Sequence, residues 1–419
     1  MDIISQLSDD VLLRILSFVP TKDVVATSLL SKKWRSLWKL VPKLVYDNSN
    51  HIGENRIFSQ FVYRSLLSNK APVLDCFHFH LNLVSDCASV DIGLWMEIAV
   101  TRHVRDLKFS IYSSKDARSV SLPSSLYTSN TLETLRLCDF VLLNVPVNVY
   151  LPSLKSLRLE LVDYLDDPTL PRLLSGCPNL EELVVGRHGL DKTMDATVLL
   201  PSLRRLTLSD KITTSGTGCR YVIDVPSLKY LNITENVVYN SRQIEDMPEL
   251  VEAHVDITHG VTQKFLRALT SARRLSLSLS LSEVIHPSGM VFNQLVHLDL
   301  YTVSEGWWDL LTHMVQDSPK LQTLKLIDKH SSGEETPNGW KPPRSVPECL
   351  LCTLEAFVWN GYQGRQGDRD MATYVLQNAV CLKTASFSPK STDVGDKYQM
   401  LKELASVPTA STSSQLLFD

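Results

Sequence analysis

The sequence has no uninterrupted apolar run of about 18 residues, the length needed to cross a bilayer, so we expect no membrane-spanning segment. Its start, Met1-Asp2-Ile3-Ile4, lacks a basic segment followed by an apolar one, and we expect no signal peptide. The 8 cysteines stand at irregular spacings, which favours free thiols over a disulfide framework. We therefore expect an intracellular protein, in the nucleus, the cytoplasm or both.

Neither sign of charge dominates, since 42 Lys and Arg stand against 46 Asp and Glu. The resulting pI near 6.3 lies far below the value of about 9 that is typical of nucleic-acid-binding domains. We expect neither a nucleic acid nor a membrane as a partner. Apolar residues make up 44% of the 419 residues, enough to build a large core in two or three domains.

Motifs of common catalytic sites are also missing, because no Gly-x-Ser-x-Gly elbow and no phosphate-binding loop occurs. Cys349 and Cys352 form the only close cysteine pair, and no second Cys/His pair lies nearby to complete a zinc site. His78 and His80 alternate on one face of a predicted strand without an apparent third ligand, which favours an exposed strand face. We predict no catalytic residue, no metal and no cofactor. A site built from distant residues is the alternative that the sequence leaves open.

Leucine is abundant, with 66 residues among 419. The pattern Leu-x-x-Leu-x-Leu occurs five times, against about 1.6 expected at random. When other apolar residues are admitted, it starts at thirteen positions 22 to 33 residues apart, mostly within the roughly 20–29 residues of leucine-rich repeats. The starts are Leu74, Val104, Leu132, Leu154, Leu180, Leu203, Leu228, Leu250, Ala272, Leu295, Leu321, Leu354 and Leu382.

Proline gives a second periodic signal, because it stands two residues before six of these starts, where a return segment should end and a strand begin. The last two apolar positions of the motif are two residues apart, which is strand alternation and not helix spacing. One repeat cannot bury its own apolar face, so neighbouring repeats must stack. We predict an α/β fold with a curved leucine-rich-repeat solenoid over residues 72–335 and a parallel sheet on its concave face.

Residues 1–45 carry helical periodicity and no repeat motif. Ser8 and Thr21 are expected to cap two of three short helices. Helices this short cannot bury all of their apolar side chains among themselves, so some must dock on the solenoid, on another chain or on both. A connecting helical segment should follow over residues 46–71.

This head resembles a plant F-box over Leu7–Asp23 and Leu30–Trp38, including the run Ser31-Lys32-Lys33-Trp34-Arg35. The resemblance implies binding to a Skp-type adaptor and, through it, to the cullin and RING protein of an SCF ubiquitin ligase. The family usually has Pro where this chain has Ser8, which predicts weaker adaptor binding. The implied adaptor contacts are Leu7, Ser8, Val11, Leu12 and Ile15, and the implied F-box core is Leu16, Val24, Leu29, Trp34, Leu37 and Trp38.

The C-terminal part resembles the FBD domain of plant F-box/LRR/FBD proteins, which implies an α/β domain over residues 336–419 that continues or caps the solenoid. The residues that carry the resemblance are Trp340, Pro347 to Leu350, Leu354 to Trp359, Tyr362, Gly364, Tyr374 to Ala379, Leu382, Phe387, Met400 to Leu404 and Gln415 to Phe418.

One residue in each repeat, between the last two apolar positions, should face the concave side. The first three of these are basic, which predicts a preference of that end for an acidic or phosphorylated client segment. A solvated strand face without such a role is the alternative. The residues are Lys108, Arg136, Arg158, Val184, Thr207, Asn232, His254, Ser276, Asp299 and Lys325.

Taken together, the residues and the two resemblances predict a substrate receptor without an active site of its own, which delivers an unknown protein client for ubiquitination and degradation. A scaffold or sequestering protein that assembles no ligase is one alternative. A receptor gated by a small ligand is another, and it would need a pocket on the concave face.

Overall fold

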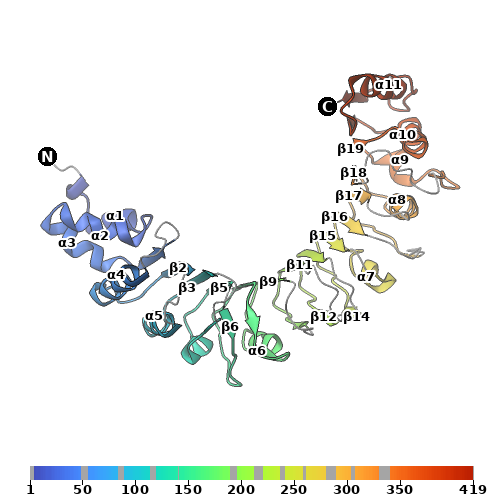
Figure 1. Ribbon diagram of the computed structural model, residues 1–419. Helices are drawn as coiled ribbons and strands as arrows, with labels where there is room; N and C mark the ends of the chain where they lie inside the picture. Colours follow the sequence, from blue (N-terminus) through green and yellow to red (C-terminus); the bar gives the residue numbers. More distant parts are fainter. Residues whose placement is uncertain are drawn as a thin grey trace. The chain divides into compact units, whose positions relative to one another are not determined.

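The computed structural model describes residues 4–48, 55–83, 89–113, 119–139, 141–188, 196–211, 220–235, 241–257, 261–279, 289–302, 307–329 and 340–418 (Figure 1). Contacts within the chain define two compact units, residues 1–191 with 195–203 and residues 192–194 with 204–419. Over the described ranges, no helix has both the length and the apolar character that a membrane span requires. The predicted boundary between residues 335 and 336 lies outside the described residues.

The first unit begins with a helical head, residues 4–40, in which short helices follow one another closely. Ser8 precedes the first α-helix as predicted, but its side chain makes no capping hydrogen bond. Thr21 is not a cap, because Pro20 holds that position, and the Thr21 hydroxyl instead accepts a hydrogen bond from the Val45 backbone N–H at 2.7 Å. The elements of the head are η1 (Ile4–Gln6), α1 (Asp9–Leu16), α2 (Thr21–Ala26), η2 (Thr27–Leu29), α3 (Lys32–Leu37) and η3 (Trp38–Leu40).

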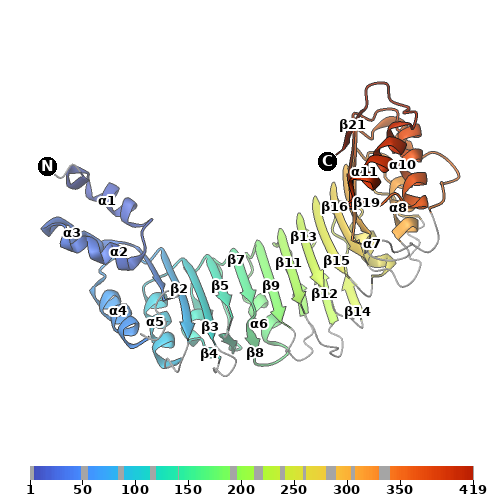
Figure 2. The same cartoon turned by 45° about the horizontal axis from the view of Figure 1, so that its top comes forward.

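After the head in the sequence, the first unit forms a parallel sheet with the strand order β1-β2-β3-β5-β7-β9 (Figure 2). Its strands are β1 (Lys43–Asp47), β2 (Cys76–Leu83), β3 (Asp106–Ser113), β5 (Thr134–Cys138), β7 (Ser156–Glu160) and β9 (Glu182–His188). The return segments contain α4 (Asn55–Ser68), α5 (Ser89–Thr101), η4 (Ser124–Thr128), α6 (Thr169–Ser175), β4 (Val120–Ser121), β6 (Val141–Leu143), β8 (Asp163–Tyr164) and β10 (Ala196–Leu199).

The second unit repeats this arrangement with the strand order β11-β13-β15-β16-β17-β18-β19-β20-β21. Its strands are β11 (Arg205–Lys211), β13 (Tyr230–Glu235), β15 (Glu252–Ile257), β16 (Arg274–Leu279), β17 (His297–Thr302), β18 (Thr323–Asp328), β19 (Ala356–Tyr362), β20 (Thr384–Pro389) and β21 (Gln415–Phe418). The return segments contain β12 (Arg220–Asp224), β14 (Ser241–Ile244), α7 (Gln263–Ala268), α8 (Trp307–Gln316), α9 (Glu348–Cys352), α10 (Gln366–Asn378) and α11 (Val394–Ala405).

The repeat prediction is confirmed at every position, because each of the thirteen motif starts lies two residues before a strand. These starting residues are at most 2% exposed. Neighbouring strands pair in parallel, and equivalent motif positions lie side by side, so that Leu135 lies beside Leu157 and Leu157 beside Leu183. Each repeat therefore covers the apolar strand face of the one before it. The predicted α/β class is confirmed.

Two strands were not predicted. β1 follows the head directly and pairs with β2, although it overlaps the segment expected to be helical from residue 46. The expected helix in that segment is α4, which starts only at Asn55. At the other end, β21 pairs with β20, so the FBD-like part adds β19, β20 and β21 to the sheet of the second unit, as the sequence predicts. Neither extra strand carries the full Leu-x-x-Leu-x-Leu pattern.

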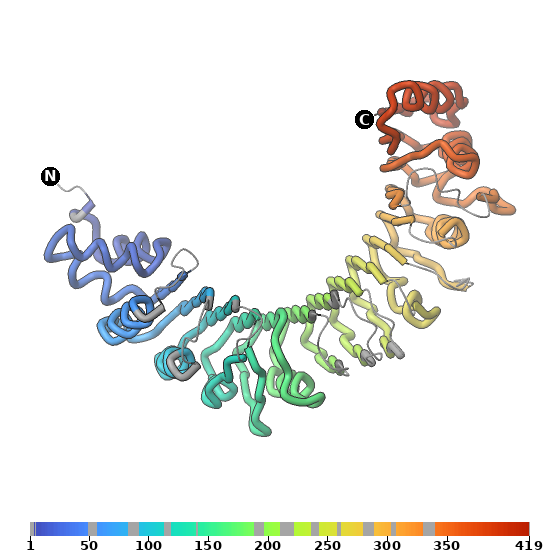
Figure 3. The backbone as a smooth tube through the Cα atoms, in the orientation of Figure 1, coloured from blue at the N-terminus to red at the C-terminus, as the bar shows by residue number. Residues whose placement is uncertain are grey.

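In both units the return segments lie on one side of the sheet. Figures 1 and 3 show α5 and α6 on one side of the first sheet, and α7, α8, α9 and α10 on one side of the second. Over the described residues, no helix covers the other side, which we call the open face. Side chains at alternate strand positions point to it and are partly exposed, as the burial pattern of β13 and β15 shows.

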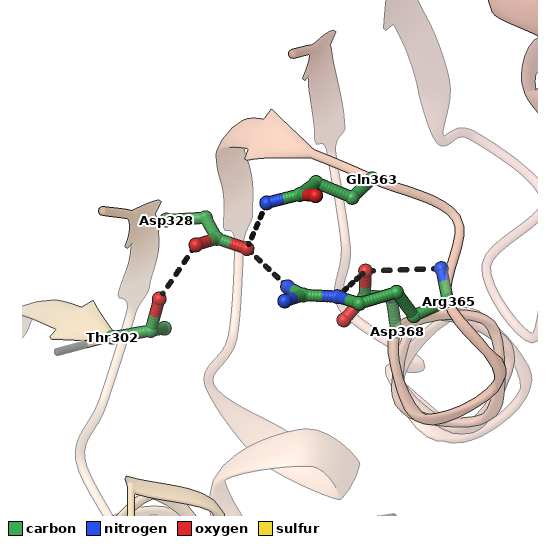
Figure 4. A network of polar contacts seen from close by, with 5 residues as sticks. All are labelled: Thr302, Asp328, Gln363, Arg365 and Asp368. Atoms are coloured by element: carbon green, nitrogen blue, oxygen red, sulfur yellow. Dashed lines mark hydrogen bonds and ion pairs between the residues drawn. The ribbon is translucent and has the colours of Figure 1, made fainter. Parts of the chain in front are cut away.

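A buried polar network joins the FBD-like part to the strands before it (Figure 4). Arg365 bonds the carboxylates of both Asp328, at the end of β18, and Asp368, in the first turn of α10. Both carboxylate side chains are fully buried. Asp328 also accepts hydrogen bonds from Thr302 Oγ1 at 3.1 Å and from Gln363 Nε2 at 3.3 Å. One guanidinium therefore bridges two carboxylates that lie 40 residues apart in the sequence.

The chain reaches this network through a bulge in β19 between Asn360 and Tyr362. Gly361 has a φ of +78°, and a Cβ there would lie 3.1 Å from the Asp328 carbonyl oxygen. Only glycine adopts this conformation without strain, and it allows the strand to pass close to β18.

We predict that Arg365→Leu lowers the free energy of unfolding of the second unit by about 3–5 kcal/mol, because it leaves two buried carboxylates without their cation. The measurement is urea unfolding of the full chain, followed by tryptophan fluorescence. Arg369→Leu is the matched control, because Arg369 pairs with Glu403 at 3.7 Å in a half-exposed setting and its loss should cost below about 1 kcal/mol. Equal losses for the two variants would contradict the role of the network.

Candidate functional site

The head has a small core of its own. Leu12 and Leu16 on α1 pack with Trp34 and Leu37 of α3, and the cluster is completed by Val24, Trp38 and Val41. Five of the six predicted core residues, all but Leu29, lie in this cluster. The cluster holds α1 against α3, which fixes the direction in which the other face of α1 points.

Two sequence assignments in the head are wrong. Leu29 is 88% exposed, because the chain changes from α2 to the 3₁₀ turn η2 at Thr27, and the tighter turn rotates Leu29 away from the core. Leu12, assigned to the adaptor surface, is 0% exposed and belongs to the core. It lies one residue after Val11, and a rotation of about 100° per residue places the two on different sides of α1.

Exposed apolar side chains lie on the other side of α1 and on the segments directly before and after this helix: Ile4, Leu7, Val11, Ile15 and Phe18, which we call the head stripe. They are 40 to 77% exposed. Val11 and Ile15 are four residues apart and therefore lie on one side of α1, and Phe18 follows in the turn after it. Ile4 and Leu7 precede Ser8, where the backbone is extended. The predicted residues Leu7, Val11 and Ile15 are all exposed, whereas Ile4 and Phe18 were not predicted.

The start of the head stripe is fixed by Lys33 on α3. Its ammonium group donates to the Leu7 carbonyl oxygen at 2.9 Å and pairs with Asp9 at 3.2 Å. One basic residue of the run Lys32-Lys33-Trp34-Arg35 therefore orients the start of α1. Lys33 contacts only the backbone of Leu7, whose side chain is 40% exposed.

The open face of the first unit carries the predicted basic residues in one row. Lys108, Arg136 and Arg158 lie on successive strands and are paired in register, with His78 before them and the 9% exposed Val184 after them. Their contribution to client binding stays a prediction.

Acidic side chains flank this basic row. Glu160 lies 3.7 Å from Arg158, and Asp106 lies 2.9 Å from His78. Burial raises the pKa of Asp106, but the hydrogen bond from His78 and the nearby Arg136 and Lys43 outweigh it, so the pKa falls below its usual value. The face is therefore a row of cations between carboxylates and not a uniformly basic patch.

The open face of the second unit contains the other predicted residues, again in one row. Thr207, Asn232, His254, Ser276, Asp299 and Lys325 are paired in register on β11 to β18. Ser276 lies near the middle of this row, and Ser278 lies two residues further along β16. Both line a hollow of about 380 Å³.

The hollow has aromatic and charged walls. Tyr230 and Tyr301 line it from opposite sides, and a cation lies over each ring: Arg205 at 4.2 Å from the ring centre of Tyr230, and Lys329 at 4.4 Å from that of Tyr301. Asp256 lies 4.0 Å from Lys329 in a half-exposed pair. Hydroxyl groups form the floor, so the hollow offers hydrogen bonds, ring faces and both signs of charge.

The sequence missed the walls of this hollow because only one residue in each strand was assigned to the open face. Tyr230 and Tyr301 lie two residues before and two residues after that position in their own strands. Strand alternation places positions two apart on the same face, so this signal was available. The hollow itself depends on the sizes of side chains in neighbouring strands. Predicting it therefore requires the register in which the strands pair.

The cysteine pair of the sequence does not form a site. Cys349 is buried and donates to the Val315 carbonyl oxygen at 3.2 Å, whereas Cys352 is exposed at the end of the same short helix. The two thiols therefore lie in different surroundings.

Comparison with protein-family models gives three matches along the chain. Residues 4–46 match the F-box domain, residues 92–254 match the LRR repeats of FBD-associated F-box protein At5g56370, and residues 341–387 match FBD.

Full-length relatives from Arabidopsis thaliana are also similar. F-box/FBD/LRR-repeat protein At4g26340 is 70% identical over 423 residues, covering 100% of both chains. Putative F-box/FBD/LRR-repeat protein At4g26350 is 49% identical and F-box/FBD/LRR-repeat protein At5g56420 is 45% identical, each over 100% of this chain and 99% of the relative.

Proposed function

The chain belongs to the F-box/FBD/LRR-repeat family, which supports a general role as a substrate adaptor, and we propose that it is the substrate-recognition subunit of an SCF ubiquitin ligase. In this proposal the head binds a Skp-type adaptor, as F-box domains generally do, and the adaptor connects it to a cullin and a RING protein. The open faces bind a protein client. The irregularly spaced cysteines favour action inside the cell, in the nucleus or the cytoplasm.

The observation that carries the proposal is the exposed head stripe. Five apolar side chains, on a short helix and on the segments directly before and after it, are left uncovered by the head's own core. A contiguous apolar surface of this kind marks an interaction site, and a helix commonly lays such a face into the groove of a partner. Leu12 and Leu16 keep α1 rigid while Val11 and Ile15 remain available.

The chemistry in this proposal belongs to the partner proteins. The chain would act by holding client lysines near a charged conjugating enzyme, which raises their effective concentration without a reacting side chain on this chain. The family supports an adaptor or receptor and not a catalyst.

The hollow on the second open face favours a second candidate, a receptor in which a small ligand and the client bind together. Its volume of about 380 Å³ falls within the range of small-molecule pockets, roughly 300–1,000 Å³. A client side chain fills the same space equally well. If the head binds no adaptor, the alternative function is a scaffold that assembles no ligase.

We predict that Val11→Asp combined with Ile15→Asp weakens binding of a purified Skp-type adaptor by about 10³-fold, because two interface anchors worth about 2 kcal/mol each are replaced by charges. The measurement is isothermal titration calorimetry with the full chain. Leu351→Asp combined with Val380→Asp is the matched control, since these two apolar residues are 46% and 51% exposed and lie far along the chain.

Adaptor binding that survives the head-stripe variant would overturn the proposal. Circular dichroism should show that both double variants are folded. Leu12→Asp does not serve this purpose, because it places a charge in the core and unfolds the head whether or not an adaptor binds there.

We predict that Ser276→Phe fills the hollow and lowers client capture at least about tenfold while adaptor binding stays unchanged. Clients are identified as proteins that the wild type captures and that accumulate when the proteasome is inhibited. Ser386→Phe is the control, because Ser386 occupies the same row of the open face on β20, outside the hollow. Equal client capture by Ser276→Phe and the wild type would show that the hollow is not part of the client site. Captured partners whose abundance does not change when the proteasome is inhibited would favour a scaffold.

A further inference from the structure

Three side chains of metal-ligand type meet on the open face of the first unit. The Sγ of Cys76, a ring nitrogen of His78 and a carboxylate oxygen of Asp106 all lie within 4.8 Å of one another. Cys76 and His78 stand two residues apart on β2, and Asp106 pairs with Cys76 in register from β3. This grouping is not visible in the sequence around His78 and His80, because the third ligand comes from the next repeat, 30 residues after Cys76.

Two ligand-type atoms in this cluster, Asp106 Oδ1 and Cys76 Sγ, make no hydrogen bond among the described residues. Asp106 Oδ1 is shielded from solvent and has no hydrogen-bond partner among the described residues, although Oδ2 lies 2.9 Å from His78 Nε2. The buried Cys76 thiol likewise makes no hydrogen bond within the described ranges, unlike the thiol of Cys349. A shielded carboxylate oxygen without a partner is unfavourable, and a cation that binds it supplies the missing interaction.

We propose that Cys76, His78 and Asp106 bind a Zn²⁺ ion through three protein ligands. Sulfur, imidazole nitrogen and carboxylate oxygen together suit zinc, whereas Mg²⁺ and Ca²⁺ take oxygen ligands almost exclusively. Tetrahedral zinc holds its ligand atoms about 3.6 Å apart, and the ligand atoms here lie within 4.8 Å of one another. Small side-chain rotations therefore reach the zinc geometry, with His78 Nε2 and Asp106 Oδ2 moving apart from their present 2.9 Å. Three protein ligands leave one coordination position for water or for a ligand from outside the chain.

The charges around the site set its strength. A thiolate and a carboxylate together neutralise the two charges of Zn²⁺. Lys43 pairs with Cys76 in register from β1, and Lys43 and Arg136 both act on Asp106, so these two cations oppose a further positive charge. The site should therefore be weaker than a structural zinc site with four ligands, and it should exchange its ion with a chelator.

The test is zinc binding to the reduced full chain, in competition with a chromophoric chelator. We expect one Zn²⁺ ion per chain, and His78→Asn and Asp106→Asn should each weaken its binding at least about tenfold, as loss of metal-site groups does. His80→Asn is the matched control, because His80 lies on the same strand and face but outside the cluster, and binding should be unchanged.

Cobalt provides a readout that identifies the sulfur ligand. Co²⁺ in the same site should show a sulfur-to-cobalt charge-transfer band that disappears in Cys76→Ser and persists in Cys138→Ser, a second thiol on this open face. Zinc binding that is equal in wild type, His78→Asn and Asp106→Asn would overturn the proposal. A charge-transfer band that survives Cys76→Ser would overturn it as well, since exposed thiols such as Cys352 would then hold the ion.

Discussion

The structure depends on the requirement that each repeat cover the apolar strand face of its neighbour. A strand with leucines at alternate positions cannot bury them alone, and burial of one leucine contributes about 1.5–3 kcal/mol only when a second layer closes over it. Pairing in register follows, because a shift of one residue would turn every leucine toward solvent. The same register aligns the remaining side chains in rows on the open faces, so residues 22 to 33 positions apart in the sequence become neighbours.

The head must also cover its apolar side chains, but it covers only part of them. α1 divides its apolar residues between two sides: Leu12 and Leu16 complete the core of the head, whereas Val11 and Ile15 stay exposed. A chain that kept all of them inside would have no surface for a partner. In the proposed function, the exposed side of α1 would bind the adaptor, and the open faces of the sheets would bind the client.

Much of this could be predicted from the sequence, because leucine spacing reports directly on strand position. Every repeat start was located from this spacing, and most of the head core, including Trp34 and Leu37, was implied by the resemblance to an F-box. Leu12 and Leu29 were misassigned because one residue of helical rotation, or a change to a 3₁₀ turn, decides which side is buried. Two features were missed: the hollow beside Ser276 and the contact between Cys76 and Asp106. Predicting either one requires the register between neighbouring strands, and the sequence of a single repeat does not reveal that register.

The central claim is that α1 uses its exposed side to bind an adaptor while the sheets remain free for a client. Hydrogen–deuterium exchange of the full chain, alone and with a Skp-type adaptor, tests this most directly. The account predicts slower amide exchange over residues 4–18 in the complex and unchanged exchange over β13 to β18. Slower amide exchange in those strands, with unchanged exchange over residues 4–18, would contradict it.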